Sequence, residues 1–236
     1  MPDPAGTSRY GCVAIVPAGG SGSRFGATIP KQYLSIAGAP VLGHTLRALA
    51  AVAAIEHLFV VVPATEDRAD DIAANVRDTT VLRCAGAQRA DTVSNALNAI
   101  AKMVRRDAWI LVHDAARPCL APADVARLLE VLRGHPVGGL LAAPVTDTLK
   151  RADEHGDVVE TVSRDRLWRA QTPQMFRYES LAHALAASPD VTDEAQAIEA
   201  LGMAPKLVPG SAGNIKITHA DDAALAEFYL SHRAAV

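Results

Sequence analysis

The fold of this chain is decided near its start by Val13-Ala-Ile-Val-Pro-Ala-Gly-Gly-Ser-Gly-Ser-Arg24-Phe-Gly-Ala-Thr-Ile-Pro-Lys31-Gln-Tyr33. The stretch begins as an uncharged run of β-forming residues, which is typical of a fully buried parallel strand. It continues into glycine and serine at positions 19–23, where the backbone can approach a ligand closely and offer its N–H groups. Two cations, Arg24 and Lys31, follow. A buried strand, a glycine-rich turn and two cations together predict a cradle for a polyphosphate.

Two common phosphate-binding patterns do not fit this stretch. The P-loop pattern fails because Phe25 lies five residues after Gly20 and no Lys-Ser/Thr pair follows it. The dinucleotide pattern G-x-G-x-x-G fails at the same phenylalanine, and Pro63 stands where that fold places an acidic residue after its second strand. These two residues disfavour an NAD-dependent oxidoreductase. A glycine-rich surface loop without a ligand is the remaining alternative.

The composition is that of an ordinary globular protein. Of the 236 residues, 50% are hydrophobic and 21% are charged, and the net charge is −3. No basic surplus indicates a nucleic-acid partner, and no apolar run reaches membrane-spanning length. Residues 1–9 are polar and lack the apolar region of a signal peptide, so we expect a loose tail followed by one domain over residues 10–236. Three widely spaced cysteines fit reduced thiols in the cytoplasm.

The chain up to residue 143 alternates strand-like apolar runs with amphipathic helical segments. The expected strands are 13–16, 57–62, 79–83, 108–112 and 137–143, and the expected helices are 40–54, 65–76 (capped by Thr65), one running through Ile100, and 123–132. This alternation predicts an α/β fold with a mainly parallel open sheet between two layers of helices. Because ligands bind outside the carboxyl ends of such strands, the loops 18–31, 85–92 and 113–118 should form the site.

The alternation stops at Pro144. Residues 145–150 and 158–162 predict a β-hairpin with a polar turn around Gly156, and we expect residues 144–163 to form an arm that reaches another subunit. Further helices are expected at 178–187, after the capping pair Thr192-Asp193, and at 221–233. Strands are expected at 206–208 and 214–218; in the second of these, Lys216 would face away from its apolar neighbours.

The charged residues after the strands suggest a chemistry. Arg24 and Lys31 can stabilise the charge that develops during phosphoryl or nucleotidyl transfer, which also commonly uses a divalent metal held by oxygen ligands. Asp114 could bind a magnesium shell or a substrate hydroxyl, or else cap a helix. Arg117 could be a structural ion-pair partner, and Lys216 a solvent-facing lysine.

Five motifs then occur in order along the chain. They are Pro17-Ala-Gly-Gly-Ser-Gly-Ser-Arg-Phe-Gly with Pro30-Lys-Gln-Tyr, Arg89-Ala-Asp-Thr-Val, Val112-His-Asp-Ala-Ala-Arg-Pro, Thr172-Pro-Gln and Asn214-Ile-Lys-Ile-Thr. Together they resemble the 2-C-methyl-D-erythritol 4-phosphate cytidylyltransferase family, which acts in non-mevalonate isoprenoid synthesis. The resemblance implies a nucleotidyltransferase fold and a reaction in which the acceptor's phosphate attacks the α-phosphorus of CTP, with Mg²⁺, to release pyrophosphate.

The resemblance also implies roles for individual residues. Arg24 and Lys31 match the pair that stabilises the transition state, and Arg164 and Lys216 match residues that position the attacking phosphate. The arm at 144–163 matches the family's homodimerisation arm, which carries Thr148 and Arg164 into the neighbouring subunit's site. The implied nucleotide-binding residues are Ala18, Gly19, Gly20, Gly86, Arg89 and Thr92; the implied substrate contacts are Asp114 (also a metal ligand), Arg117, Thr148, Thr172, Thr192 and Asp193.

Two other functions share these features. A ribitol 5-phosphate cytidylyltransferase of the same fold would share the nucleotide half of the site and differ only on the acceptor side. A non-catalytic nucleotide sensor would bind CTP but release no pyrophosphate; the presence of Arg24, Lys31 and Lys216 argues against it.

Overall fold

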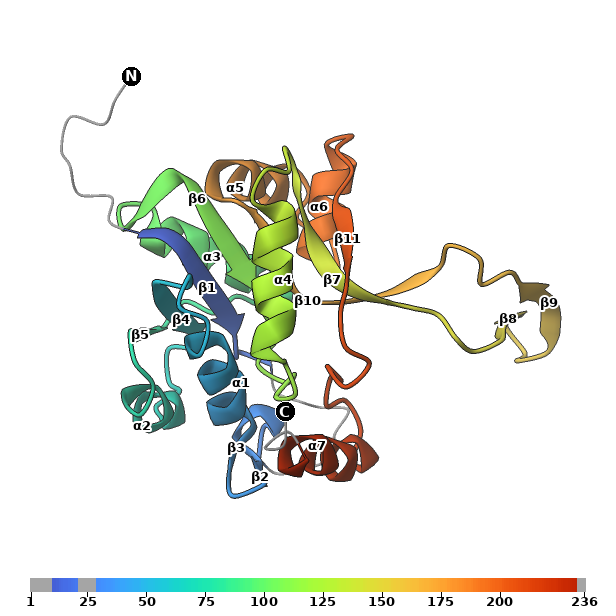
Figure 1. Ribbon diagram of the computed structural model, residues 1–236, viewed down its shortest axis with the longest axis horizontal. Helices are drawn as coiled ribbons and strands as arrows, with labels where there is room; N and C mark the ends of the chain where they lie inside the picture. Colours follow the sequence, from blue (N-terminus) through green and yellow to red (C-terminus); the bar gives the residue numbers. More distant parts are fainter. Residues whose placement is uncertain (1–9, 21–28, 233–236) are drawn as a thin grey trace.

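The uncharged run near the start of the chain forms β1 (Tyr10–Pro17), an inner strand of a seven-stranded sheet (Figure 1). The computed structural model describes residues 10–20 and 29–232. The order across the sheet is β11 (Lys206–Pro209), β7 (Gly138–Pro144), β10 (Trp168–Arg177), β6 (Val104–Val112), β1, β4 (His57–Val61) and β5 (Thr79–Leu82). All neighbouring strands are parallel except that β10 runs antiparallel to both β6 and β7.

Helices cover both faces of the sheet because its inner strands are apolar on both sides. Ala14 and Val16 of β1 pack towards α1 (Val41–Ala50) and α4 (Pro122–Leu132), with α2 (Arg68–Ala74) beside them. Val13 and Ile15 point the other way, towards α3 (Arg89–Ile100), α5 (Tyr178–Ala187) and α6 (Glu194–Ala200). The described parts of the chain contain no helix long and apolar enough to cross a membrane. The predicted fold class is confirmed.

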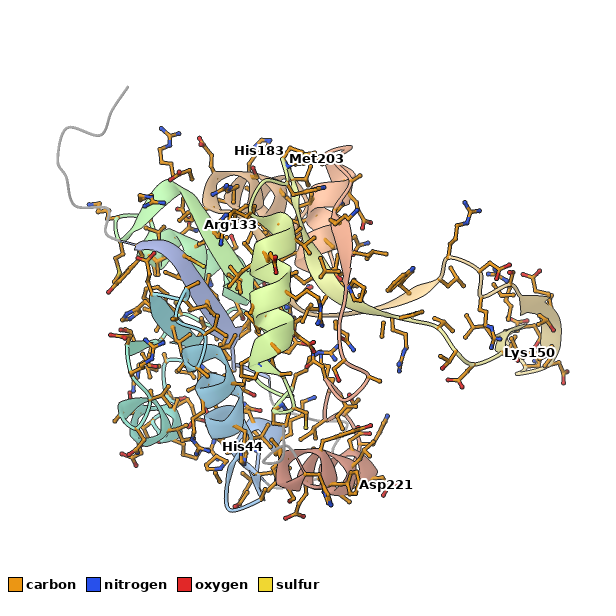
Figure 2. The ribbon with its side chains drawn as sticks, viewed as in Figure 1. His44, Arg133, Lys150, His183, Met203 and Asp221 are labelled. Carbon is orange, nitrogen blue, oxygen red and sulfur yellow. The ribbon has the colours of Figure 1, made fainter. Side chains whose placement is uncertain are left out.

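Several smaller elements complete the chain. The short helix η2 (Lys31–Tyr33) precedes a two-stranded hairpin of β2 (Ser35–Ile36) and β3 (Ala39–Pro40). The helix α7 (Asp221–Ser231) packs near this hairpin at one end of the molecule, where Figure 2 labels Asp221.

The predicted hairpin is present and stands away from the domain. Its strands β8 (Leu149–Ala152) and β9 (Val158–Val162) form a separate antiparallel sheet. Figure 1 shows this hairpin at the end of a long projection from β7 and β10, and Figure 2 labels Lys150 at its far end. The side chains of Val158 and Val159 are 63% and 62% exposed there. Two large apolar side chains therefore face solvent at the tip of the arm.

Three details differ from the sequence predictions. The antiparallel strand β10 was not predicted, because its residues around Gln171 and Gln174 lack a clean apolar pattern. Residues 214–218 do not form a strand; the Ile217 N–H instead donates to the Ala116 carbonyl, which ties this segment to the loop after β6. Thr65 does not cap α2, which begins at Arg68 after Asp67. The predicted cap of α6 is confirmed, because the Asp193 carboxylate accepts the Gln196 N–H.

Candidate active site

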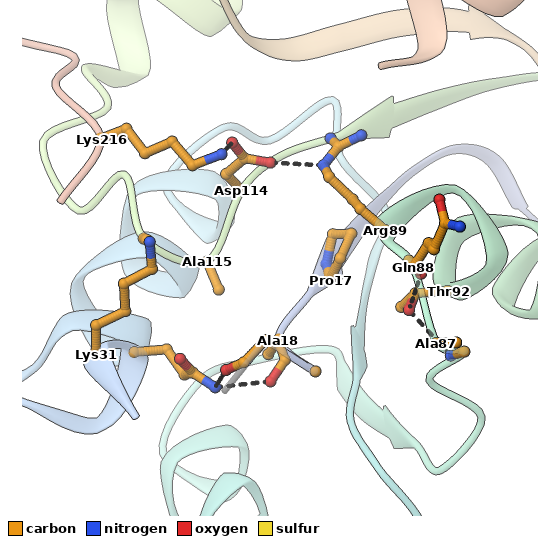
Figure 3. Close-up of a pocket in the computed structure, with 15 residues that line it drawn as sticks. Pro17, Ala18, Lys31, Ala87, Gln88, Arg89, Thr92, Asp114, Ala115 and Lys216 are labelled. Carbon is orange, nitrogen blue, oxygen red and sulfur yellow. Dashed lines mark hydrogen bonds and ion pairs between the residues drawn. The ribbon is translucent and has the colours of Figure 1, made fainter. Parts of the chain in front are cut away.

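The loops that follow β1, β5 and β6 meet around a cavity of about 290 Å³ at the carboxyl edge of the sheet (Figure 3). Ala18, Gly19 and Gly20 come from the first loop, residues 86–89 with Thr92 from the second, and residues 114–116 from the third. The side chains of Lys31, Gln32 and Lys216 complete the lining. The three loops predicted from the sequence therefore converge, as expected for the carboxyl ends of parallel strands in one sheet.

Close packing makes two of the loop glycines necessary. A Cβ atom at Gly86 would lie 2.2 Å from the Asp91 Cβ, and one at Gly19 would lie 2.8 Å from the Ala85 Cβ. The Thr92 hydroxyl accepts the Gly86 N–H at 3.0 Å and donates to the Gln88 carbonyl at 3.0 Å. Thr92 thus fixes the shape of the loop that lines the cavity.

Gln32 couples the first loop to Lys31, although the sequence pattern did not single it out. Its side chain is buried, and its amide nitrogen donates to the Ala18 carbonyl at 2.9 Å and to the Gly20 carbonyl at 3.1 Å. Since Gln32 follows Lys31 directly in η2, this amide sets the position of the Lys31 backbone relative to the glycine loop.

Asp114 is the electrostatic centre of the site. One carboxylate oxygen accepts the Arg89 Nε–H at 2.9 Å, and the other pairs with Lys216 Nζ at 2.8 Å and with Arg117 Nε at 3.8 Å. Burial raises the pKa of Asp114, but the charges of Arg89 and Lys216 outweigh that effect, so its pKa lies well below the ordinary value. Asp114 is therefore ionised at any physiological pH.

Glu194 supplies a second buried carboxylate that the sequence analysis did not identify. It is fully buried at the start of α6, and its two oxygens accept Arg89 Nη1 at 2.7 Å and Nη2 at 3.0 Å. Arg89 therefore bridges two carboxylates and is held in a fixed orientation, as bidentate pairing requires. The sequence carries no signal for this pair, because the two residues lie 105 positions apart.

The predicted substrate contact Thr172 lies buried behind Asp114. Its hydroxyl accepts the Asp114 N–H at 3.1 Å and lies 2.9 Å from His113 Nδ1. Burial lowers the pKa of His113 to about 4, so its ring is neutral at physiological pH. In this structure the Thr172 hydroxyl contacts protein groups on the inner side of the loop.

A second cavity of about 290 Å³ adjoins the first, and Lys216 lines both. Arg117, Arg169, Gln171 and Asn214 are among its other lining residues. Within the described residues, four buried side-chain polar atoms have no hydrogen-bond partner, and three belong to this cavity: Arg117 Nε, Gln171 Oε1 and Asn214 Oδ1. The residues that carry these atoms give the cavity a polar and cationic wall, although the three atoms themselves expose almost no surface.

Other predicted residues lie elsewhere. Thr148 and Arg164 are exposed on the arm and line neither cavity of their own chain; an Arg164 nitrogen donates to the Thr146 carbonyl. Thr192 and Asp193 lie at the start of α6, where the Asp193 carboxylate accepts the Gln174 amide at 2.9 Å, and they also line neither cavity. Arg24 lies outside the described residues.

The protein side chains do not form a metal-binding cluster in the part of the chain that is described. No three His, Cys, Asp or Glu side chains come together in a way that could hold an ion. Asp114, the predicted metal ligand, already accepts from cations at both oxygens. This donor set does not fit a metal held by the protein alone.

Comparisons with known proteins agree on one family. A family model described as 2-C-methyl-D-erythritol 4-phosphate cytidylyltransferase matches residues 12–232. The chain is similar to cytidylyltransferases of that name from Azoarcus sp. (strain BH72), at 52% identity over 94% of this chain and 95% of the relative, and from Dechloromonas aromatica (strain RCB), at 53% over 93% and 97%.

Solved structures give the same result. A crystal structure of 4-diphosphocytidyl-2C-methyl-D-erythritol synthase matches with a TM-score of 0.84 and 38% identity, over 94% of this chain and 99% of that one. The crystal structure of 2-C-methyl-D-erythritol 4-phosphate cytidylyltransferase from Thermus thermophilus matches with a TM-score of 0.76 and 30% identity, over 92% and 97%.

The buried neutral histidine gives a prediction about stability and pH. Unfolded, His113 takes up a proton near pH 6.5, whereas the folded chain resists protonation until about pH 4. The contribution of His113 to the free energy of unfolding is therefore complete above pH 6.5, and about 3 kcal/mol of it is lost as the pH falls to 4. The test is urea unfolding of wild type and His113→Gln at pH 7, 5.5 and 4. The unfolding free energy of wild type minus that of the variant should fall by this amount between pH 7 and pH 4. A constant difference would contradict the buried neutral ring.

Proposed function

The chain belongs to the 2-C-methyl-D-erythritol 4-phosphate cytidylyltransferase family, and from that premise we propose that its two adjoining cavities hold the two substrates. The resemblance found in the sequence motifs is confirmed. The enzyme transfers a cytidylyl group from CTP to 2-C-methyl-D-erythritol 4-phosphate. An acceptor phosphate oxygen bonds to the α-phosphorus of CTP, the α–β bridging bond breaks, and pyrophosphate leaves with 4-diphosphocytidyl-2-C-methyl-D-erythritol as the product.

CTP occupies the first cavity in this proposal. Its lining includes several glycines and alanines from the loops around Gly19 and Gly86, where the chain can approach a flat base and a ribose closely. Lys31 projects into the same cavity and can stabilise the negative charge that builds on the reacting phosphate. Arg24, the predicted second cation of the same sequence motif, would act on the same phosphates.

The acceptor phosphate occupies the second cavity, and the observation that carries this assignment is that Lys216 lines both cavities. Two anionic phosphates must approach each other before reaction, and a cation at the junction reduces their repulsion. Arg117 supplies a second cation there. Gln171 and Asn214 also line this cavity, and their amide groups give it the polar character that suits a sugar alcohol.

Asp114 keeps the cations in place before the substrates arrive. The carboxylate holds Lys216 at 2.8 Å, so the lysine does not need to be ordered at the moment of reaction. Preorganised charges of this kind contribute to catalysis because the cost of orienting them is met during folding. The acceptor phosphate would then share Lys216 with Asp114.

Mg²⁺ enters as part of the nucleotide substrate in this proposal. The metal commonly binds through substrate phosphates with few protein ligands. That mode agrees with a cavity in which Asp114 is already surrounded by cations. When bound, the metal would offset charge on the triphosphate.

The active form is a homodimer in this proposal, and the arm at 144–163 completes the partner's site. Thr148 and Arg164 are exposed and line neither cavity of their own chain. The exposed Val158 and Val159 at the arm's tip give it an apolar surface to bury. The three free cysteines agree with a cytoplasmic enzyme.

The reaction can be tested directly by pyrophosphate release. Wild type with CTP and Mg²⁺ should release pyrophosphate with methylerythritol phosphate and not with ribitol 5-phosphate. Lys31→Ala should lower kcat roughly 10²–10³-fold, since it removes a group that stabilises the transition state. The exposed Lys102→Ala should have no effect. Release with ribitol 5-phosphate alone would overturn the acceptor, and CTP binding without any release would favour a nucleotide sensor.

The dimeric site can be tested by mixing two inactive variants. Arg164→Ala and Lys216→Ala should each lose activity as homodimers. If Arg164 acts in the neighbouring subunit, a mixed dimer has one site with both residues intact. Random exchange gives half mixed dimers, so activity should recover to about a quarter of wild type. No recovery after verified subunit exchange would mean that Arg164 does not act across the interface.

A further inference from the structure

Three buried residues and the partly buried Arg117 form a closed ring of hydrogen bonds behind the junction of the two cavities. Thr172 Oγ1 lies 2.9 Å from His113 Nδ1, and His113 Nε2 lies 3.2 Å from the Arg117 carbonyl. Arg117 Nη1 donates to the Asn214 carbonyl at 2.7 Å, and the Asn214 amide donates to the Thr172 carbonyl at 2.8 Å. The ring therefore begins and ends at Thr172.

The direction of every bond in the ring is fixed by chemistry. A carbonyl oxygen can only accept, so His113 Nε2 must carry the proton that points to Arg117. In the neutral ring Nδ1 is then unprotonated and accepts the Thr172 O–H. The Thr172 oxygen keeps a lone pair for the Asp114 N–H at 3.1 Å. One tautomer of His113 thus satisfies the whole arrangement.

The ring connects the three segments that carry the charged groups of the site. His113 immediately precedes Asp114, Arg117 is itself a member, and Asn214 lies two residues before Lys216. The strand β10 joins through Thr172. These four bonds therefore help to fix the relative positions of Asp114, Arg117 and Lys216. His113 is fully buried and lines neither cavity, so it contacts no substrate in either of them.

We propose that His113 is a positioning residue for cytidylyl transfer, whose two ring nitrogens hold Arg117 and the Asp114–Lys216 pair in place for the acceptor phosphate. The inference rests on the proposed function, because it assigns these cations to the acceptor. Gln32, in contrast, holds the glycine loop on the CTP side. Loss of the ring should therefore weaken use of the acceptor and spare binding of CTP.

The test compares variants of His113 that remove both of its side-chain hydrogen bonds with variants that remove only one. His113→Phe keeps a flat ring and removes both nitrogens. His113→Gln can place an amide N–H near the Nε2 position, and His113→Asn can place an oxygen near Nδ1. The exposed His183→Phe on α5 is the matched control, and Figure 2 labels His183. Steady-state rates are measured with each substrate varied in turn.

His113→Phe should raise KM for methylerythritol phosphate by roughly tenfold, as expected when buried hydrogen-bonding groups lose their partner. KM for CTP should change by less than about twofold, and His183→Phe should change neither. His113→Gln and His113→Asn should each recover part of the loss. If the phenylalanine variant does not fold, the KM values of these two variants for methylerythritol phosphate and for CTP are compared with those of wild type instead. Unchanged values for both substrates, or an equal rise in both, would overturn the positioning role.

Hydrogen exchange separates failure of this inference from failure of the proposed function. Absence of turnover in wild type would contradict the proposed function alone. The ring would still be tested, because amide exchange of residues 113–117 should be faster in His113→Phe than in wild type or His183→Phe. Equal exchange in all three proteins would contradict the ring as the element that fixes this turn.

Discussion

The arrangement of the site depends on one buried carboxylate, that of Asp114. Arg89, Lys216 and Arg117 converge on it, and they would repel one another without an anion between them. Glu194 neutralises part of the charge from the far side of Arg89. Three cations against two carboxylates leave one positive charge in excess, beside Lys31. The excess positive charge can thus attract phosphates, while the two buried carboxylates each have a cationic partner in the folded protein.

The carboxylate of Asp114 lies just after β6 and is supported by β10, the antiparallel strand of the sheet. The chain leaves β7, runs out into the arm and returns as β10, antiparallel to β7 and to β6. This return places Thr172 beside the end of β6, where its hydroxyl accepts the Asp114 N–H. The same excursion therefore produces the exposed arm and the strand that supports the buried end of the site.

The sequence was informative where local patterns carry the information. The apolar run at 13–16, the glycines after it and the alternation of strands and helices predict the sheet, and the rule for its carboxyl edge locates the loops of Gly19, Gly86 and Asp114. It was uninformative where a contact joins distant segments. The burial of Glu194 depends on its ion pair with Arg89, which lies 105 positions away in the sequence. The hydrogen bond of the His113 side chain depends on Thr172, which lies 59 positions away. Lys216 lies in an irregular segment held by loop contacts, which its alternating pattern does not distinguish from a strand.

The most direct test of Asp114 as the organising group is a double-mutant cycle of Asp114→Asn with Lys216→Ala, measured as kcat/KM for the acceptor. If Asp114 acts by holding Lys216, the two residues work as a unit, and the double variant should lose little more than the more damaging single variant. Losses that multiply would mean that the two residues contribute independently, and would contradict the organising role of Asp114.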